Sequence, residues 1–89
     1  METKHENNKI SFLENSEEKA FISYVPSGDI LTVDHTVVSP DLEGQGIGKK
    51  LVAEVVQYAR DEGKTIDAQC PFASAIIEKN PEFQDILAK

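Results

Sequence analysis

Cysteine and histidine are scarce in this chain of 89 residues. The single cysteine, Cys70, excludes an internal disulfide, and with only His5 and His35 beside it the chain offers no zinc ligand set. Long apolar runs are also missing, since none exceeds three residues and a membrane-spanning helix needs roughly 18. We therefore expect neither a metal site nor a membrane segment.

Basic residues are outnumbered by acidic ones, which bears on the partners of the chain. The formal net charge is −7, and a surface of that sign repels nucleic acid and anionic membranes. The only adjacent basic pair is Lys49-Lys50. The polar residues 1–9 lack the apolar region of a signal peptide. We expect a cytoplasmic protein that binds no nucleic acid, and a monomer because no long apolar stripe predicts a dimer.

Hydrophobic periodicity predicts a fold of mixed α-helices and β-strands, of the class called α/β or, because its first strands are antiparallel, α+β. Alternating or β-branched stretches predict strands, and a four-residue spacing that begins at Ile47 predicts an amphipathic helix. The expected order is β-β-β-α-β-α, in which the first three strands form an antiparallel meander. Residues 1–9 are predicted to be a mobile tail and residues 10–89 a single domain. Alternation at 10–12 and at 20–24 predicts the first two strands, with a turn at 14–17 between them, and the other predicted strands are 30–38 and 65–70. The predicted helices are 47–62 and 71–79, and a last helical turn is 82–87.

A glycine cluster precedes the first predicted helix, with Gly44, Gly46 and Gly48 inside five residues. Glycine adopts positive φ at little cost and lets the backbone approach a ligand closely. Successive N–H groups in such a turn converge on an anion, and the helix N-terminus adds unpaired donors, so a pyrophosphate would fit. A P-loop is excluded because it needs four residues between its glycines, and Gly44 and Gly48 have three. A dinucleotide-binding fingerprint, G-x-G-x-x-G, is also excluded, because its third glycine would come one residue after Gly48.

The stretch from Val37 to Leu51 resembles the GNAT acetyltransferase superfamily, in which a strand and a short proline-containing link precede (Gln/Arg)-x-x-Gly-x-(Gly/Ala). The first motif position here is Glu43, and we expect its side chain to point away from the phosphates. The resemblance covers roughly residues 10–87 and is closest to the minimal Yjdj-type GNAT domain. Three further features carry it: Asp34-His35-Thr36 before the turn, Cys70 at the end of the next strand, and Asn80-Pro81-Glu82-Phe83 near the C-terminus.

This resemblance implies that acetyl-CoA is the acetyl donor and that its thioester lies between the strand before the turn and the strand after the helix. The backbone of Val37 and Val38 would contact the acetyl-pantetheine arm. The lysines of the turn would pair with phosphates or simply form a solvated helix face. The residues expected at the phosphates are Gly44, Gln45, Gly46, Ile47, Gly48, Lys49 and Lys50.

Two side chains flank the expected thioester, His35 and Cys70. Alternation places His35 on one face with Leu31, Val33 and Val37, where it is either a core residue or a general base. Cys70 is either a small buried side chain or a nucleophile that accepts the acetyl group, its pKa lowered by the following helix start or by His35. The rival route is direct attack by the acceptor amine, with His35 or a water as base.

The expected function is acetyl transfer from acetyl-CoA to an amine. Only Glu14 to Ser16 separates the first two predicted strands, which leaves little wall around an acceptor. Such an open cleft suits a peptide or protein amine. It equally suits a non-catalytic acetyl-CoA-binding module that acts as sensor or carrier. A purely structural interaction domain is a third hypothesis, and it predicts no CoA binding.

Overall fold

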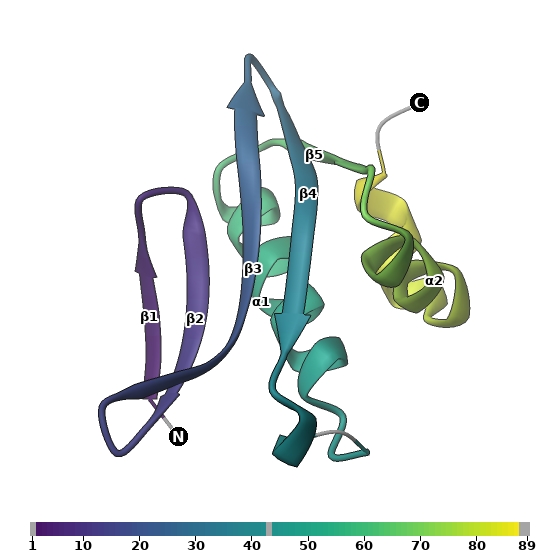
Figure 1. Cartoon of the computed structure of the whole chain (residues 1–89). Coiled ribbons are helices and arrows are strands. Elements are labelled where there is room, and N and C mark those ends of the chain that lie inside the picture. The colour runs from purple at the N-terminus through teal and green to yellow at the C-terminus, as the bar shows by residue number, and fades with distance from the viewer. Residues whose placement is uncertain (1, 43, 88–89) are drawn as a thin grey trace.

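The computed structural model describes residues 2–42 and 44–87, and Figure 1 shows a sheet accompanied by helices. Within these residues the sheet has five strands in the order β1 (Glu2–Glu6), β2 (Lys9–Glu14), β3 (Glu17–Ser27), β4 (Ile30–Val38) and β5 (Thr65–Ala68). The α-helices are α1 (Ile47–Asp61) and α2 (Pro71–Lys79), and the 3-10 helices are η1 (Pro40–Leu42) and η2 (Pro81–Ile86). The predicted α+β class is confirmed.

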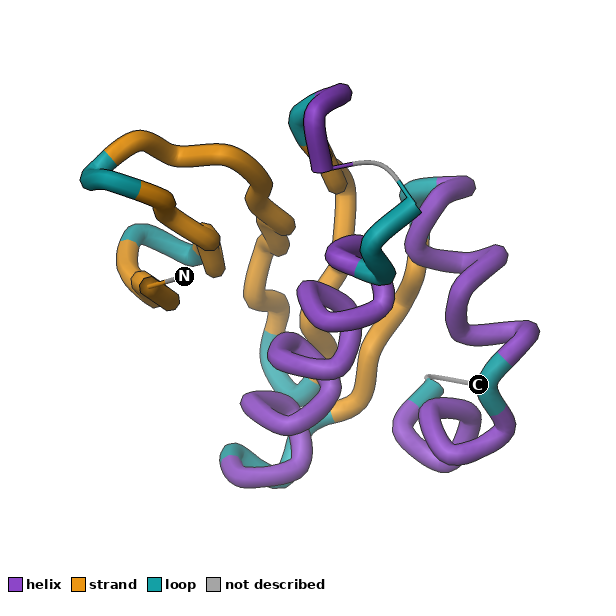
Figure 2. Tube along the Cα trace, turned by 90° about the horizontal axis from the view of Figure 1, so that it is seen from below, coloured by secondary structure: helices purple, strands orange, loops and turns teal. Residues whose placement is uncertain are grey.

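Neighbouring strands from β1 to β4 are antiparallel, whereas β4 and β5 are parallel and α1 connects them. Helix α1 lies along one face of the sheet, and α2 and η2 lie beyond its β5 edge (Figures 1 and 2). The turn between β2 and β3 is only two residues long, because Asn15 and Ser16 adopt positive φ and reverse the chain at once. This topology leaves the carboxyl ends of β4 and β5 beside the N-termini of α1 and α2.

The core lies between α1 and the sheet. The four-residue spacing places Ile47, Leu51, Val55 and Ala59 on one side of α1, and each of them is buried. They face alternate residues of the strands, which are buried for the same reason: Ile10, Phe12, Ala20, Ile22, Tyr24, Leu31 and Val33. The intervening residues of β3 and β4 are mostly half-buried or exposed. One face of the sheet is therefore packed and the other stays accessible.

The N-terminal residues differ from the prediction of a mobile tail over residues 1–9. Glu2–Glu6 forms β1 and pairs along its length with β2, so four strands precede α1. The imidazole of His5 holds the strand in place, because its Nε2 lies 2.5 Å from the Tyr24 hydroxyl oxygen and its ring meets the Tyr58 ring edge-on. All five residues of β1 are exposed, so no hydrophobic alternation marks this edge strand.

Candidate functional site

A cavity of about 650 Å³ opens beside the C-terminal half of β4, the glycine turn and the N-terminal half of α2. The sequence predicted much of its wall, namely Val37, Val38, Gly44, Gly46, Ile47, Gly48 and Lys49. Its other lining residues are Thr36, Leu42, Phe72 and Ile76, which the sequence analysis did not assign to a site. The segments that the resemblance implied for a cofactor therefore meet around one largely apolar space.

The glycine turn has the backbone conformation that an anion site requires. Gly44 and Gly46 have φ of 82° and 72°, and Gly46 is the left-handed N-cap of α1 without a side-chain cap. The first turn of α1 contains no acidic residue. Its leading N–H groups have no partner within the helix, so they are available to an anion. Glu43, whose side chain we expected to point away from phosphates, lies outside the described residues.

Gly48 is required for a different reason from its two neighbours. Its backbone is helical, but an added Cβ would lie 2.5 Å from Cε1 and Cζ of Phe72 and 3.3 Å from Cδ1 of Ile76. The start of α1 and the start of α2 therefore approach each other as closely as they do only because this position has no side chain. Phe72 remains 47% exposed at the cavity wall. The sequence alone does not indicate this contact between Phe72 and Gly48.

Two of the predicted phosphate ligands, Gln45 and Lys50, are not part of this cavity. They line a second cavity of about 480 Å³ between α1 and the first two strands, to which Ile47 also contributes. Lys49 does line the first cavity, and its Nζ lies 3.9 Å from Oε1 of Glu82. The Lys49-Lys50 pair is thus divided between two sides of α1, and we expect only Lys49 to reach a ligand in the first cavity.

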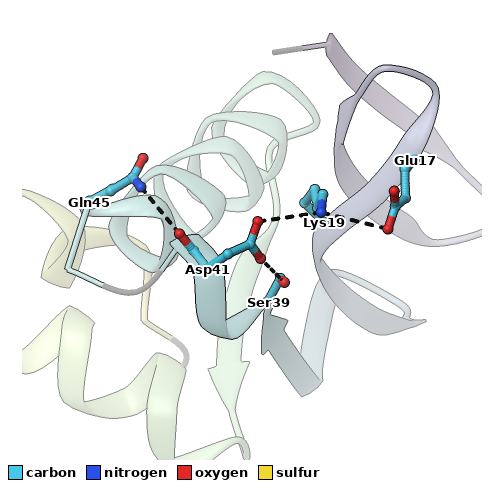
Figure 3. A network of polar contacts seen from close by, with 5 residues as sticks. All are labelled: Glu17, Lys19, Ser39, Asp41 and Gln45. Atoms are coloured by element: carbon cyan, nitrogen blue, oxygen red, sulfur yellow. Dashed lines mark hydrogen bonds and ion pairs between the residues drawn. The ribbon is translucent and has the colours of Figure 1, made fainter.

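The link between β4 and the glycine turn is held by a polar network (Figure 3). Lys19 of β3 places its Nζ 3.3 Å from Oδ2 of Asp41 in η1, and the Ser39 hydroxyl donates to the same carboxylate. The Ser39 hydrogen bond lowers the pKa of Asp41, and Lys19 adds to this effect. Gln45 Nε2 donates to the Asp41 carbonyl oxygen at 3.4 Å. These exposed contacts contribute little to stability, but they orient η1 and the turn that follows.

A β-bulge changes the predicted position of His35. Ser23 pairs with His35 but Tyr24 pairs with Val33, so Asp34 is an extra residue of β4. The inserted residue shifts the alternation by one, and His35 leaves the face of Leu31 and Val33. Its side chain is 71% exposed, and Nδ1 lies 3.4 Å from Oδ2 of Asp34. The prediction that His35 shares the buried face was therefore wrong, and His35 does not line the cavity.

Cys70 lies at the N-cap of α2 and is only 8% exposed. Strand β5 ends at Ala68, two residues before the predicted end, because the Gln69 and Cys70 N–H groups both bond the Val33 carbonyl oxygen. Burial alone would raise the pKa of the Cys70 thiol. Nearby donors that favour the thiolate, namely the Ala73 N–H, the Thr36 hydroxyl, the Phe72 N–H and the Thr36 N–H, lower this pKa below its ordinary value.

The groups that lower the pKa of Cys70 connect it to the cavity. Cys70 itself is absent from the lining within the described residues, but Thr36 and Phe72 belong both to the lining and to the surroundings of the sulfur. Donors at the start of α2 are thus among the groups that lower the pKa of Cys70. Cys70 as a nucleophile remains a prediction.

The part of the chain that the structure describes has no group of three or more His, Cys, Asp or Glu side chains able to hold a metal ion. No helix of residues 2–42 and 44–87 is long and apolar enough to span a membrane.

The chain is an α+β domain with a cavity at its glycine turn, where N–H groups at the start of α1 have no partner within the helix. A family model described as GCN5-related N-acetyl-transferase matches residues 9–86. The chain belongs to this family. A GCN5-like protein from Staphylococcus aureus, solved by NMR, is 37% identical with a TM-score of 0.82, and the match covers 98% of this chain and 87% of that one.

More distant structures share the fold alone. The ribosomal-protein-S18-alanine N-acetyltransferase of Escherichia coli is 20% identical with a TM-score of 0.70, and the match covers 84% of this chain and 53% of that one. N-acetylglutamate synthase from Neisseria gonorrhoeae, in complex with coenzyme A and N-acetyl-glutamate, is 15% identical with a TM-score of 0.68; the match covers 88% of this chain and 22% of that one. A search of curated proteins returned no match.

Proposed function

We propose that this protein binds acetyl-CoA in the cavity of about 650 Å³ and transfers the acetyl group to an amine by way of Cys70. The observation that carries the proposal is the continuity of this cavity from the glycine turn to Thr36 and Phe72, two residues that lower the pKa of the Cys70 thiol. Membership of the acetyltransferase family and the likeness to a CoA complex support acetyl-CoA as the ligand.

In this proposal the cofactor lies along the cavity with its phosphates at the glycine turn. The N–H groups at the start of α1 and the Lys49 ammonium would receive the pyrophosphate. The pantetheine arm would then pass along the backbone of Val37 and Val38, opposite Ile76. This orientation brings the thioester to the end of the cavity that is nearest Cys70.

Cys70 as thiolate would attack the carbonyl carbon of the acetyl thioester. A sulfur–carbon bond forms to Cys70, the bond to the CoA sulfur breaks, and CoA leaves as a thiolate that takes up a proton from water. The acceptor amine, in its neutral form, then attacks the acetyl-cysteine. The amide bond forms, Cys70 leaves as a thiolate, and the amine nitrogen releases one proton to solvent. A lowered pKa favours Cys70 both as nucleophile and as leaving group.

The rival is direct attack of the amine on acetyl-CoA with His35 as base. The exposed imidazole beside Asp34 would serve only an acceptor that arrives over the outer face of β4. Intact mass measurement after incubation with acetyl-CoA separates the two routes. We expect an acetyl adduct on the wild type and on His35→Ala but not on Cys70→Ala. Wild-type protein that turns over without any adduct would contradict the covalent route.

A second candidate function is a binding module that holds acetyl-CoA without turnover. It is favoured by the two-residue turn at Asn15-Ser16, which leaves no segment between β2 and β3 to form an acceptor wall. Calorimetric binding of acetyl-CoA and release of free CoA thiol over a panel of amines and basic peptides distinguish the candidates. Tight binding without release above the background of Cys70→Ala would favour the module. No binding at all would refute both.

A further inference from the structure

The bulge at Asp34 turns the side chain of Thr36 toward the interior of the site. Before the bulge Leu31 and Val33 are buried, and after it His35 and Val37 are exposed while Thr36 lines the cavity. The Thr36 hydroxyl oxygen is fully buried and, among the described residues, has no hydrogen-bond partner, the Cys70 sulfur included. Buried polar groups are nearly always paired, so this hydroxyl calls for an explanation.

The nearest chemistry that could use this hydroxyl is the sulfur of Cys70. The Cys70 N–H donates to the Val33 carbonyl oxygen at 3.1 Å, which holds Cys70 against β4 close to Thr36. The groups that lower the pKa of the Cys70 thiol come from two elements, the Ala73 and Phe72 N–H groups from α2 and Thr36 from β4. A neutral thiol is a weak acceptor, so a hydrogen bond from the hydroxyl to it would be weak. A thiolate is a charged acceptor and would bind all of these donors.

We propose that Thr36 is a positioning residue, whose hydroxyl donates a hydrogen bond to the Cys70 thiolate and keeps the sulfur at the cavity wall. This inference rests on the proposed function only for the role of the thiolate as a nucleophile. The hydrogen bond itself exists without acetyl-CoA. This hydrogen bond would give a partner to a buried hydroxyl at a position where valine would fill the same volume.

The test is a titration of the thiolate by its ultraviolet absorbance in the absence of acetyl-CoA. The signal reports one group, because Cys70 is the only cysteine of the chain. The variants are Thr36→Val, which removes the hydroxyl at nearly constant volume, and Thr36→Ser, which keeps it. Thr32→Val is the matched control, since Thr32 lies on the same strand before the bulge and does not line the cavity. Cys70→Ala provides the background.

We expect Thr36→Val to lower the acid dissociation constant of the Cys70 thiol about tenfold, the scale of one hydrogen bond to a charged group. Thr36→Ser and Thr32→Val should titrate like the wild type. A Thr36→Val curve that coincides with the wild type would overturn the inference. So would a Thr36→Ser curve that follows Thr36→Val, because packing and not the hydroxyl would then be the cause. If Thr36→Val does not fold, Thr36→Ala replaces it in the same comparison.

Acetyl transfer is measured separately, so the two proposals fail independently. A titration that shifts as expected, together with no acetyl adduct on the wild type, would leave the positioning role intact and refute the covalent route. An acetyl adduct that forms with the same pH profile in Thr36→Val and wild type would support the proposed function and overturn this inference.

Discussion

The effect of replacing Gly48 by alanine on stability should depend on whether the Phe72 ring is present. Gly48 has a helical backbone, so alanine there should stabilise the fold by roughly 0.5–1 kcal/mol through the reduced freedom of the unfolded chain. Against this, the new Cβ would lie 2.5 Å from two ring carbons of Phe72. Neither atom can remain where it is.

The size of the conflict follows from how easily the ring can move. Overpacking a core costs about 1–3 kcal/mol, but the ring of Phe72 is half-exposed and can leave its rotamer for about 0.5–1.5 kcal/mol. Gly48→Ala should therefore be neutral or destabilising by up to about 1 kcal/mol when Phe72 is present. In a Phe72→Ala background the conflict vanishes, and the substitution should stabilise by roughly 0.5–1 kcal/mol.

Urea unfolding of the wild type, both single variants and the double variant measures this coupling directly. We expect an interaction free energy of about 0.5–1.5 kcal/mol between the two positions, which is the cost of moving the ring. Thermal unfolding should agree, because 1 kcal/mol shifts the midpoint by about 4–8 °C in a domain of this size. A coupling below about 0.5 kcal/mol would show that the ring does not lie against Gly48, and the account of this glycine would fail.

Two further predictions concern charge. Glu82→Gln should tighten acetyl-CoA binding about two- to fivefold at low salt, because a carboxylate 3.9 Å from Lys49 Nζ competes with phosphate for that ammonium. Calorimetry with Glu78→Gln as control measures this, and equal gains in both variants would refute a specific role for Glu82. Separately, burial and the Tyr58 hydroxyl raise the pKa of Tyr24 from its ordinary 10.0 to about 12. The unfolded chain therefore ionises first, and the free energy of unfolding should fall more steeply between pH 10.0 and about 12 in the wild type than in Tyr24→Phe.

Periodicity predicted the elements that bury one regular face. The bounds of β4 and the start of α1 agree with the prediction, since a β-branched run and a four-residue stripe both report burial directly. Strand β1 has no such signal, because none of its residues is buried. Its place in the sheet depends on pairing with β2 and on the contact of His5 with two tyrosines, and neither is encoded in local alternation.

The cavity was predicted only where glycine spacing carries information. The turn at Gly44 and Gly46 could be predicted because glycine is the residue type that adopts positive φ most readily. Thr36 resembles any other β-forming residue, and counting by twos from Val33 assigns it to the wrong face. The error arises at Asp34, where one inserted residue changes the alternation without changing the composition. A bulge depends on how two strands pair, which a single strand does not reveal.

The same bulge divides β4 into two halves with separate tolerance to mutation. Leu31 and Val33 are committed to the core, and their replacement should be limited by folding alone. Beyond Asp34 the strand faces the cavity with Thr36 and Val38 and contributes less to the core. Variation in that half can therefore alter the shape and polarity of the cavity while the scaffold is preserved. In a domain of 89 residues, this separation provides a place where new specificity can be selected or engineered.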